Sequence, residues 1–173
     1  DVNSFDDLFA LEKLICNGVN EITYIHNDAL QILHCENSGV VEITGKSLIQ
    51  INCNNCNDLH VINAPKLKEL QCRNTRMNYF KYEYLERLDC SHCLVRKISQ
   101  EDCPNLKYLI CRNTHIKEVN DLPLLIELGC NHSLIRTIDI TKLPNLKAIK
   151  NHKKKGETKL ILINGKKMRH ILI

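Results

Sequence analysis

The sequence has no Trp and few other aromatic side chains, with five Tyr and three Phe among 173 residues. A core must therefore be built mainly from aliphatic side chains. The longest apolar runs are short, such as those at 160–163 and 124–126. A membrane-spanning helix needs roughly 20 apolar residues, and no run in the sequence approaches that length. The net charge of +4 is too small to indicate a nucleic-acid or membrane partner by itself. The length fits one folded domain.

Cysteine is the residue present in excess, with ten in the chain. Seven of them are separated by 19, 18, 19, 18, 21 and 19 residues, and they are Cys16, Cys35, Cys53, Cys72, Cys90, Cys111 and Cys130. Each closes the phrase L-x-x-L-x-C, with Ile at the second Leu in one copy, and an eighth copy ends at Asn151 instead. A disulfide framework or a metal site has no reason to be periodic along a whole chain. The period therefore predicts a solenoid of stacked repeats.

The alternation inside each phrase predicts one short strand per repeat. Counted from the first Leu, the fourth and sixth places point to one face, and the third, fifth and seventh places point to the other. Stacking then forms a parallel sheet with columns of Leu and Cys inside. The return segments contain Pro, Gly and Asn, which predicts turns, extended pieces or single 3₁₀ turns rather than long helices.

Three residues after the Cys comes a small side chain, usually Thr or Ser, and two residues later an aliphatic one, most clearly in the copy at 104–116. This phrase resembles the leucine-rich repeat, L-x-x-L-x-L-x-x-N/C-x-L, with Cys in place of the third Leu and unusually short repeats. The resemblance implies an α/β-type solenoid, a leucine-rich-repeat horseshoe with about eight short parallel strands over residues 11–151. The usual crossover rule makes it right-handed.

The two ends are expected to be caps. Ser4-Phe5-Asp6-Asp7 is typical of a helix start, so residues 1–10 are predicted to form an N-terminal helical cap. Asn164-Gly165 between two apolar runs predicts a C-terminal capping β-hairpin over residues 152–173. The start at Asp1 without Met fits either the boundary of a fragment or a processed end, and the apolar end at 171–173 leaves open a continuation of the protein.

Two Cys pairs have the spacing of half a zinc site, Cys53-x-x-Cys56 and Cys90-x-x-Cys93. They fall in the third and fifth repeats, so strands about 4.8 Å apart place the pairs about 10 Å from each other. Four thiolates on zinc must converge within roughly 4 Å. Cys56 and Cys93 also take the slot that Thr or Ser holds in other repeats. We interpret all four as core residues and expect no metal and no other cofactor.

The seven periodic cysteines, called the ladder cysteines here, are also expected to stay free of disulfides. Neighbouring side chains would be parallel and near strand spacing, whereas disulfides prefer Cβ separations of about 3.8 Å. Thiols packed as small apolar groups suit a reducing environment, so an intracellular location in the cytoplasm or nucleus is predicted.

No set of residues combines into a catalytic arrangement. Cys90, His92 and Cys93 lie together, but the register turns both cysteines inward, and a reactive Cys needs exposure and a cationic neighbour. Cys103 follows two carboxylates, which disfavour its thiolate. No Gly-rich phosphate loop or nucleophile elbow is present in the sequence. The chain is therefore predicted not to be an enzyme.

A basic segment lies near the end of the chain, at Lys153-Lys154-Lys155, followed by Lys166, Lys167 and Arg169. No aromatic side chains are interleaved with it, so nucleic-acid binding is not favoured. We interpret it as a solvated cap that protects a terminal sheet edge. The alternative, a weak site for phosphate or nucleic acid, stays open.

The outward face of the predicted sheet is the expected binding surface, because solenoids use such extended concave faces. One row combines an aromatic, an aliphatic and a basic side chain, with charged neighbours on one flank and space at Gly129 on the other. The candidate binding residues are Tyr108, Ile110, Arg112, Arg87, Asp89 and Arg73. Tyr and Arg are common hot-spot residues. The competing interpretation is that single exposed apolar residues are ordinary.

The resemblance and this row together predict a non-enzymatic protein-protein interaction module, acting as a monomer on an unidentified protein partner, with no membrane contact. Two alternatives stay open. The chain could be the substrate-recognition region of a larger enzyme, similar to bacterial effector ubiquitin ligases. It could also be a structural or assembly component, for example of a virus, since the sequence is rich in Ile, Asn and Lys.

Overall fold

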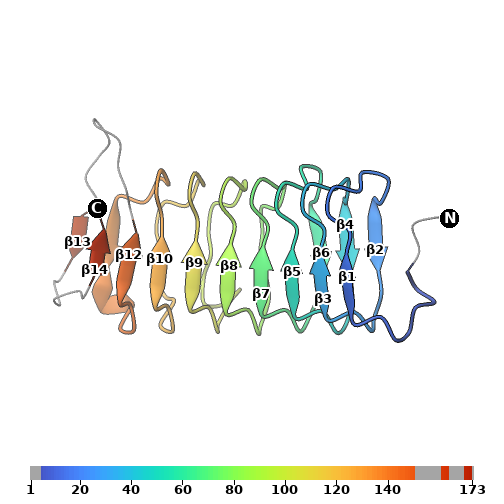
Figure 1. Ribbon diagram of the computed structural model, residues 1–173. Coiled ribbons are helices and arrows are strands. Elements are labelled where there is room, and N and C mark those ends of the chain that lie inside the picture. Colours follow the sequence, from blue (N-terminus) through green and yellow to red (C-terminus); the bar gives the residue numbers. More distant parts are fainter. Residues whose placement is uncertain (1–4, 151–160, 164–169, 173) are drawn as a thin grey trace.

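The computed structural model describes residues 5–150, 161–163 and 170–172, and the side chains of residues 5–150. Strands of three residues dominate, and every pairing between them is parallel. Most of them belong to one sheet, in which they stand side by side in a long row (Figure 1). The nine-stranded sheet contains β1(Lys13–Ile15), β3(Ile32–His34), β5(Gln50–Asn52), β7(Glu69–Gln71), β8(Arg87–Asp89), β9(Tyr108–Ile110), β10(Glu127–Gly129), β12(Ala148–Lys150) and β14(His170–Leu172).

The return segments carry the remaining strands. Three of them form a small sheet, namely β2(Tyr24–His26), β4(Glu42–Thr44) and β6(Val61–Asn63). Two more pair near the C-terminal end, namely β11(Thr137–Asp139) and β13(Ile161–Ile163). Other returns are turns and extended chain, and the one helical element in the described residues is a 3₁₀ turn, η1(Ile140–Lys142). The predicted repeat solenoid and its mostly non-helical returns are confirmed. The α/β label is wrong, because the described residues contain almost no helix.

The sheet register follows the repeat phrase. Each of the eight phrases contains one strand, and equal places pair, as Glu69 with Arg87 and Arg87 with Tyr108. The middle residue of each of these strands is buried or nearly so, while the residues on either side are mostly exposed or half-buried. The alternation predicted from the sequence is therefore present in the strands of all eight phrases.

The sulfur columns fill the core beside the Leu and Ile columns. All ten cysteines are buried and free. Each ladder Cys extends the sheet by one backbone bond to the next coil, as when Cys111 N–H donates to Gly129 O at 2.7 Å. Where the residue three places later is Thr or Ser, its hydroxyl donates to the backbone carbonyl of that Cys, as when Thr114 Oγ1 donates to Cys111 O at 2.8 Å. These bonds explain why a hydroxyl is so common at that place.

A left-handed residue turns the chain two places after each ladder Cys. These residues and their φ angles are Gly18 (73°), Asn37 (55°), Asn55 (61°), Asn74 (54°), His92 (62°), Asn113 (51°) and His132 (57°). Gly and Asn adopt this conformation most easily, and His is also enriched there. The exposed Asn side chains bond from coil to coil, Asn55 Nδ2 to Asn37 Oδ1 at 2.9 Å and Asn74 Nδ2 to Asn55 Oδ1 at 2.7 Å. The turn thus recurs at the same position in successive coils of the solenoid.

The predicted N-terminal helical cap is wrong for residues 5–10, which form turns, while Ser4 lies outside the described residues. The cause is the buried side chain of Asn27, whose Nδ2 donates to Phe5 O at 2.7 Å and to Leu8 O at 3.1 Å. A helix would use these carbonyls for its own i→i+4 bonds. The contact with the first coils therefore replaces helix formation.

The predicted C-terminal hairpin is also wrong. β13 pairs with β11 and β14 pairs with β12, both in parallel, so the two strands join different sheets instead of each other. The physical reason is that β11 and β12 each have an open edge, and one further coil supplies a partner to both. Asn164-Gly165 lies outside the described residues. The exact division of the chain at residues 10 and 151 stays a prediction.

Candidate functional site

The side of the nine-stranded sheet that carries the third-, fifth- and seventh-place side chains is called the ladder face here. The structure places all six candidate binding residues on it. Arg87 and Asp89 lie on β8, Tyr108 and Ile110 lie on β9, and Arg73 and Arg112 follow β7 and β9. The parallel register brings them together, because each coil adds one strand beside the last.

A hollow of about 250 Å³ opens on the ladder face over β7, β8 and β9. This hollow is called the front hollow here. It is lined by the central strand residues Leu70 and Leu88 and by six outward residues, Glu69, Gln71, Arg87, Asp89, Tyr108 and Ile110. Four of the six outward residues were predicted from the sequence. The two from β7, Glu69 and Gln71, were missed, although the register column in which they lie was visible in the sequence.

Arg87 holds together the third-place residues that line one side of the front hollow. Its Nε lies 3.4 Å from Glu69 Oε1, and its guanidinium carbon lies 3.9 Å from the centre of the Tyr108 ring. The cation–π contact and the ion pair act on opposite sides of one side chain. The side chains of Glu69, Arg87 and Tyr108, from three neighbouring strands, therefore contact one another in a continuous row.

Asp89 organises the opposite side. Its Oδ1 accepts hydrogen bonds from the backbone N–H of Ser91 at 3.0 Å and from Ser91 Oγ at 2.6 Å. Its Oδ2 lies 3.9 Å from Arg73 Nε, beyond hydrogen-bond distance. The carboxylate is largely satisfied by Ser91, and its side chain is only 18% exposed.

The space expected over Gly129 is partly occupied. A Cβ added at Gly129 would lie 3.4 Å from Ile110 Cγ2, so the Ile110 side chain already leans over this glycine. The open volume lies on the other flank of β9, toward β8 and β7. The sequence located the row but not the direction in which Ile110 points.

The two Cys-x-x-Cys pairs have backbone partners. Cys56 Sγ donates to Cys35 O at 2.9 Å, and Cys93 Sγ donates to Cys72 O at 2.9 Å. Cys53 Sγ donates to Gln71 O at 3.3 Å. Burial raises the pKa of Cys53 well above its usual value, which favours the neutral thiol. Within the described residues, no group of three or more His, Cys, Asp and Glu side chains is arranged to hold a metal.

Cys103 lies outside the ladder and is also buried. Its Sγ donates to Phe80 O at 3.8 Å. Burial, helped by the nearby Asp102 carboxylate, raises the pKa of Cys103 to about 11. A thiol in this state is a packing group and a poor nucleophile.

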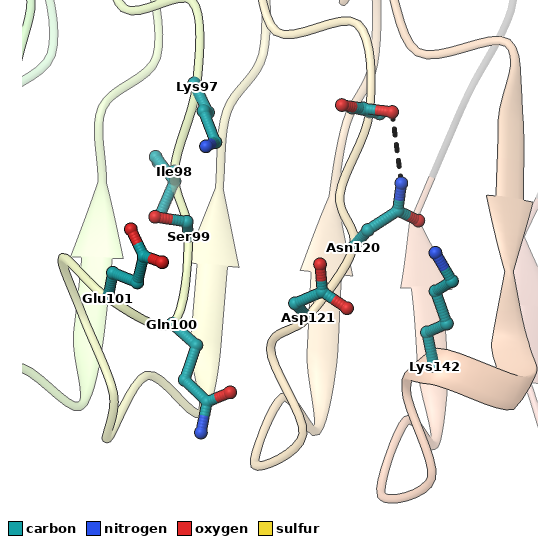
Figure 2. A pocket seen from close by; sticks show the side chains of 9 residues that line it. Lys97, Ile98, Ser99, Gln100, Glu101, Asn120, Asp121 and Lys142 are labelled. Carbon is teal, nitrogen blue, oxygen red and sulfur yellow. Dashed lines mark hydrogen bonds between the residues drawn. The ribbon is translucent and has the colours of Figure 1, made fainter.

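A larger hollow, of about 490 Å³, lies between return segments on another side of the solenoid (Figure 2). Figure 2 shows Lys97, Glu101, Asp121 and Lys142 around it, and Asn120 Nδ2 donates to Glu118 Oε2 at 3.1 Å. Its charges are mixed, and the hydroxyl of the lining residue Ser99 donates to Asp102 Oδ2 at 2.6 Å. This hollow was not predicted from the sequence, although the 21-residue interval from Cys90 to Cys111 indicated a longer return at this place.

The basic segment at 153–155, with Lys166, Lys167 and Arg169, lies outside the described residues. No helix in the described part of the chain has the length and apolar character needed to cross a membrane.

No protein-family model and no curated protein matches the chain. Among solved structures, it is similar to the functional domain of InlJ from Listeria monocytogenes, which is described as including a cysteine ladder. The identity is 18% and the TM-score is 0.54, over 83% of this chain and 44% of that one. The chain thus spans less than half of the matched structure. The likeness concerns the fold alone and supports a leucine-rich-repeat-like solenoid.

Proposed function

We propose that the protein is a non-enzymatic protein-interaction module that binds a partner protein on the ladder face, around the front hollow. The observation that carries this proposal is the front hollow itself. An aromatic ring and an aliphatic side chain line it, on a sheet whose other outward side chains are mostly polar. Extended solenoid faces suit protein ligands because neighbouring coils present many side chains on one surface.

The chemistry of the row supports this role. Tyr and Arg are enriched in binding hot spots, where a ring or guanidinium fills a desolvated pocket. Arg87 and Tyr108 are already held against each other at 3.9 Å, so little side-chain freedom is lost when a partner binds them. The ten buried free thiols support a further part of the proposal, namely that the protein works in a reducing compartment.

The test is a capture experiment from native lysate in reducing buffer. Wild type is compared with a variant that carries Tyr108→Ala, Ile110→Ser and Arg112→Ala. A matched control carries Tyr84→Ala, Leu94→Ser and Arg96→Ala, which change exposed residues of similar types on other surfaces. Circular dichroism checks that both variants keep the wild-type fold.

We expect wild type and control to capture the same protein and the ladder-face variant to lose it. Equal capture by all three proteins would place binding elsewhere and contradict the proposal. Loss by the control alone would point to the return segments.

A further inference from the structure

One cation beside the front hollow, at its rim, has no side-chain partner in the part of the chain that the structure describes. Arg112 follows β9 and is exposed, and within the described residues its guanidinium makes no hydrogen bond or ion pair. Its backbone is engaged on both sides: the N–H donates to Ser91 Oγ at 3.3 Å, and the carbonyl accepts from His92 N–H at 2.8 Å. Arg87 differs, because its guanidinium contacts both Glu69 and Tyr108. The free guanidinium of Arg112 is therefore available to a ligand.

The rim carries an excess of positive charge. Arg73, 49% exposed, approaches only one atom of Asp89, at 3.9 Å, and the other carboxylate oxygen of Asp89 is occupied by Ser91. Two guanidinium groups, of Arg73 and Arg112, thus belong to this part of the ladder face, and its one nearby carboxylate, Asp89, is already bonded to Ser91. On the third-place side, Glu69 and Arg87 neutralise each other. The hollow is therefore lined by the apolar groups of Tyr108 and Ile110 on β9. The ion pair of Glu69 and Arg87 lies on one side of it, and the cationic side chains of Arg73 and Arg112 form the rim on the other.

The distance between hollow and rim suits an extended chain. Ile110 and Arg112 are two residues apart, which corresponds to roughly 7 Å along a strand. In an extended partner segment, alternate side chains point to the same side and are separated by the same distance. A segment that runs along the strand direction can place one side chain in the hollow and a second at Arg112.

We propose that the front hollow recognises an extended protein segment in which an aliphatic side chain stands two residues from Asp or Glu. The aliphatic group packs between Tyr108 and Ile110, and the carboxylate meets the guanidinium groups of Arg112 and Arg73. This inference rests on the proposed function, because it names the chemistry of the partner at the same site. Guanidinium groups can bind carboxylates with two parallel hydrogen bonds.

The first experiment selects a displayed library of random 12-residue peptides on the immobilised full chain. The protein is tested as wild type, as Arg112→Glu and as Arg96→Glu, which reverses another exposed charge, on a return segment. We expect wild type and Arg96→Glu to enrich aliphatic-x-acidic peptides. Arg112→Glu should lose the acidic preference. Circular dichroism confirms that the three proteins share one fold.

A second measurement uses two acetylated and amidated peptides that differ only in a central Leu-Ser-Glu or Leu-Ser-Gln. Fluorescence anisotropy should show about fivefold tighter binding of the Glu peptide to wild type, as for a partly exposed ion pair. The difference should disappear in Arg112→Gln and shrink at high salt. A Glu preference that persists in Arg112→Gln contradicts the assignment.

The outcomes separate this inference from the proposed function. If the library enriches no peptide, or enriches peptides without an acidic preference, the inference is wrong. The proposed function still stands in that case if the lysate partner is lost with Tyr108→Ala and Ile110→Ser. If those substitutions change neither lysate capture nor peptide selection, both are wrong.

Discussion

At the scale of single residues, one backbone conformation sets the path of each coil. The left-handed residue is Gly or Asn in five coils and His in two, at His92 and His132. A non-Gly residue in this region costs roughly 1–2 kcal/mol, and Asn tolerates it better than most because its side chain bonds locally. The sequence carried this signal two places after each Cys, but the change of residue type hid it.

His92→Asn should therefore raise the free energy of unfolding by about 0.5 kcal/mol, whereas His92→Val should lower it by about 1–2 kcal/mol. The φ of His92 is 62°, which a β-branched residue adopts poorly. Urea unfolding measures both. As a control, His115→Val changes an exposed His that is not left-handed and should have a small effect. Equal losses for both Val variants would contradict this account of the turn.

At the scale of elements, the repeated phrase predicted the strands correctly, whereas single local motifs gave wrong predictions for the two ends. Each phrase carries its own alternation, so the eight strands and their register followed from the sequence. The caps were wrong because Ser4 and Asn164-Gly165 are local signals, while the ends are set by contacts with neighbouring coils. The row around Tyr108 was predictable from register. The position of the Ile110 side chain over Gly129 was not predictable, because it depends on the side-chain rotamer.

Asn27 is the residue that ties the N-terminal turns to the solenoid. Its Oδ1 accepts from Ala29 N–H and Leu30 N–H, both at 2.9 Å, and its Nδ2 holds Phe5 and Leu8 carbonyls. Asn27→Ala should lower the free energy of unfolding by about 2–3 kcal/mol, because buried groups lose their partners. Hydrogen exchange should show residues 5–11 opening first. The exposed Asn20→Ala is the control, and an equal loss there would contradict the role of Asn27.

At the scale of the whole molecule, the buried thiols make the fold sensitive to alkali. Burial raises the pKa of Cys16 to about 11, and burial and Asp102 raise the pKa of Cys103 to about 11. Unfolded thiols ionise near pH 8.5. The folded state therefore holds protons that the unfolded state releases. This contribution to stability is fully present below about pH 8.5 and is lost as the pH rises to about 11.

Unfolding in urea at pH 7.5, 8.5, 9.5 and 10.5 in reducing buffer should show a free energy that falls steeply only above about pH 8.5. Each thiol with a raised pKa adds a slope of about 1.4 kcal/mol per pH unit. Cys103→Ala should reduce the slope by one such step, whatever it does to stability at neutral pH. The comparison of slopes separates thiols from Tyr and Lys, which both proteins share. A profile that stays flat to pH 10.5, or a slope that Cys103→Ala leaves unchanged, would mean that these thiols are not buried as neutral groups.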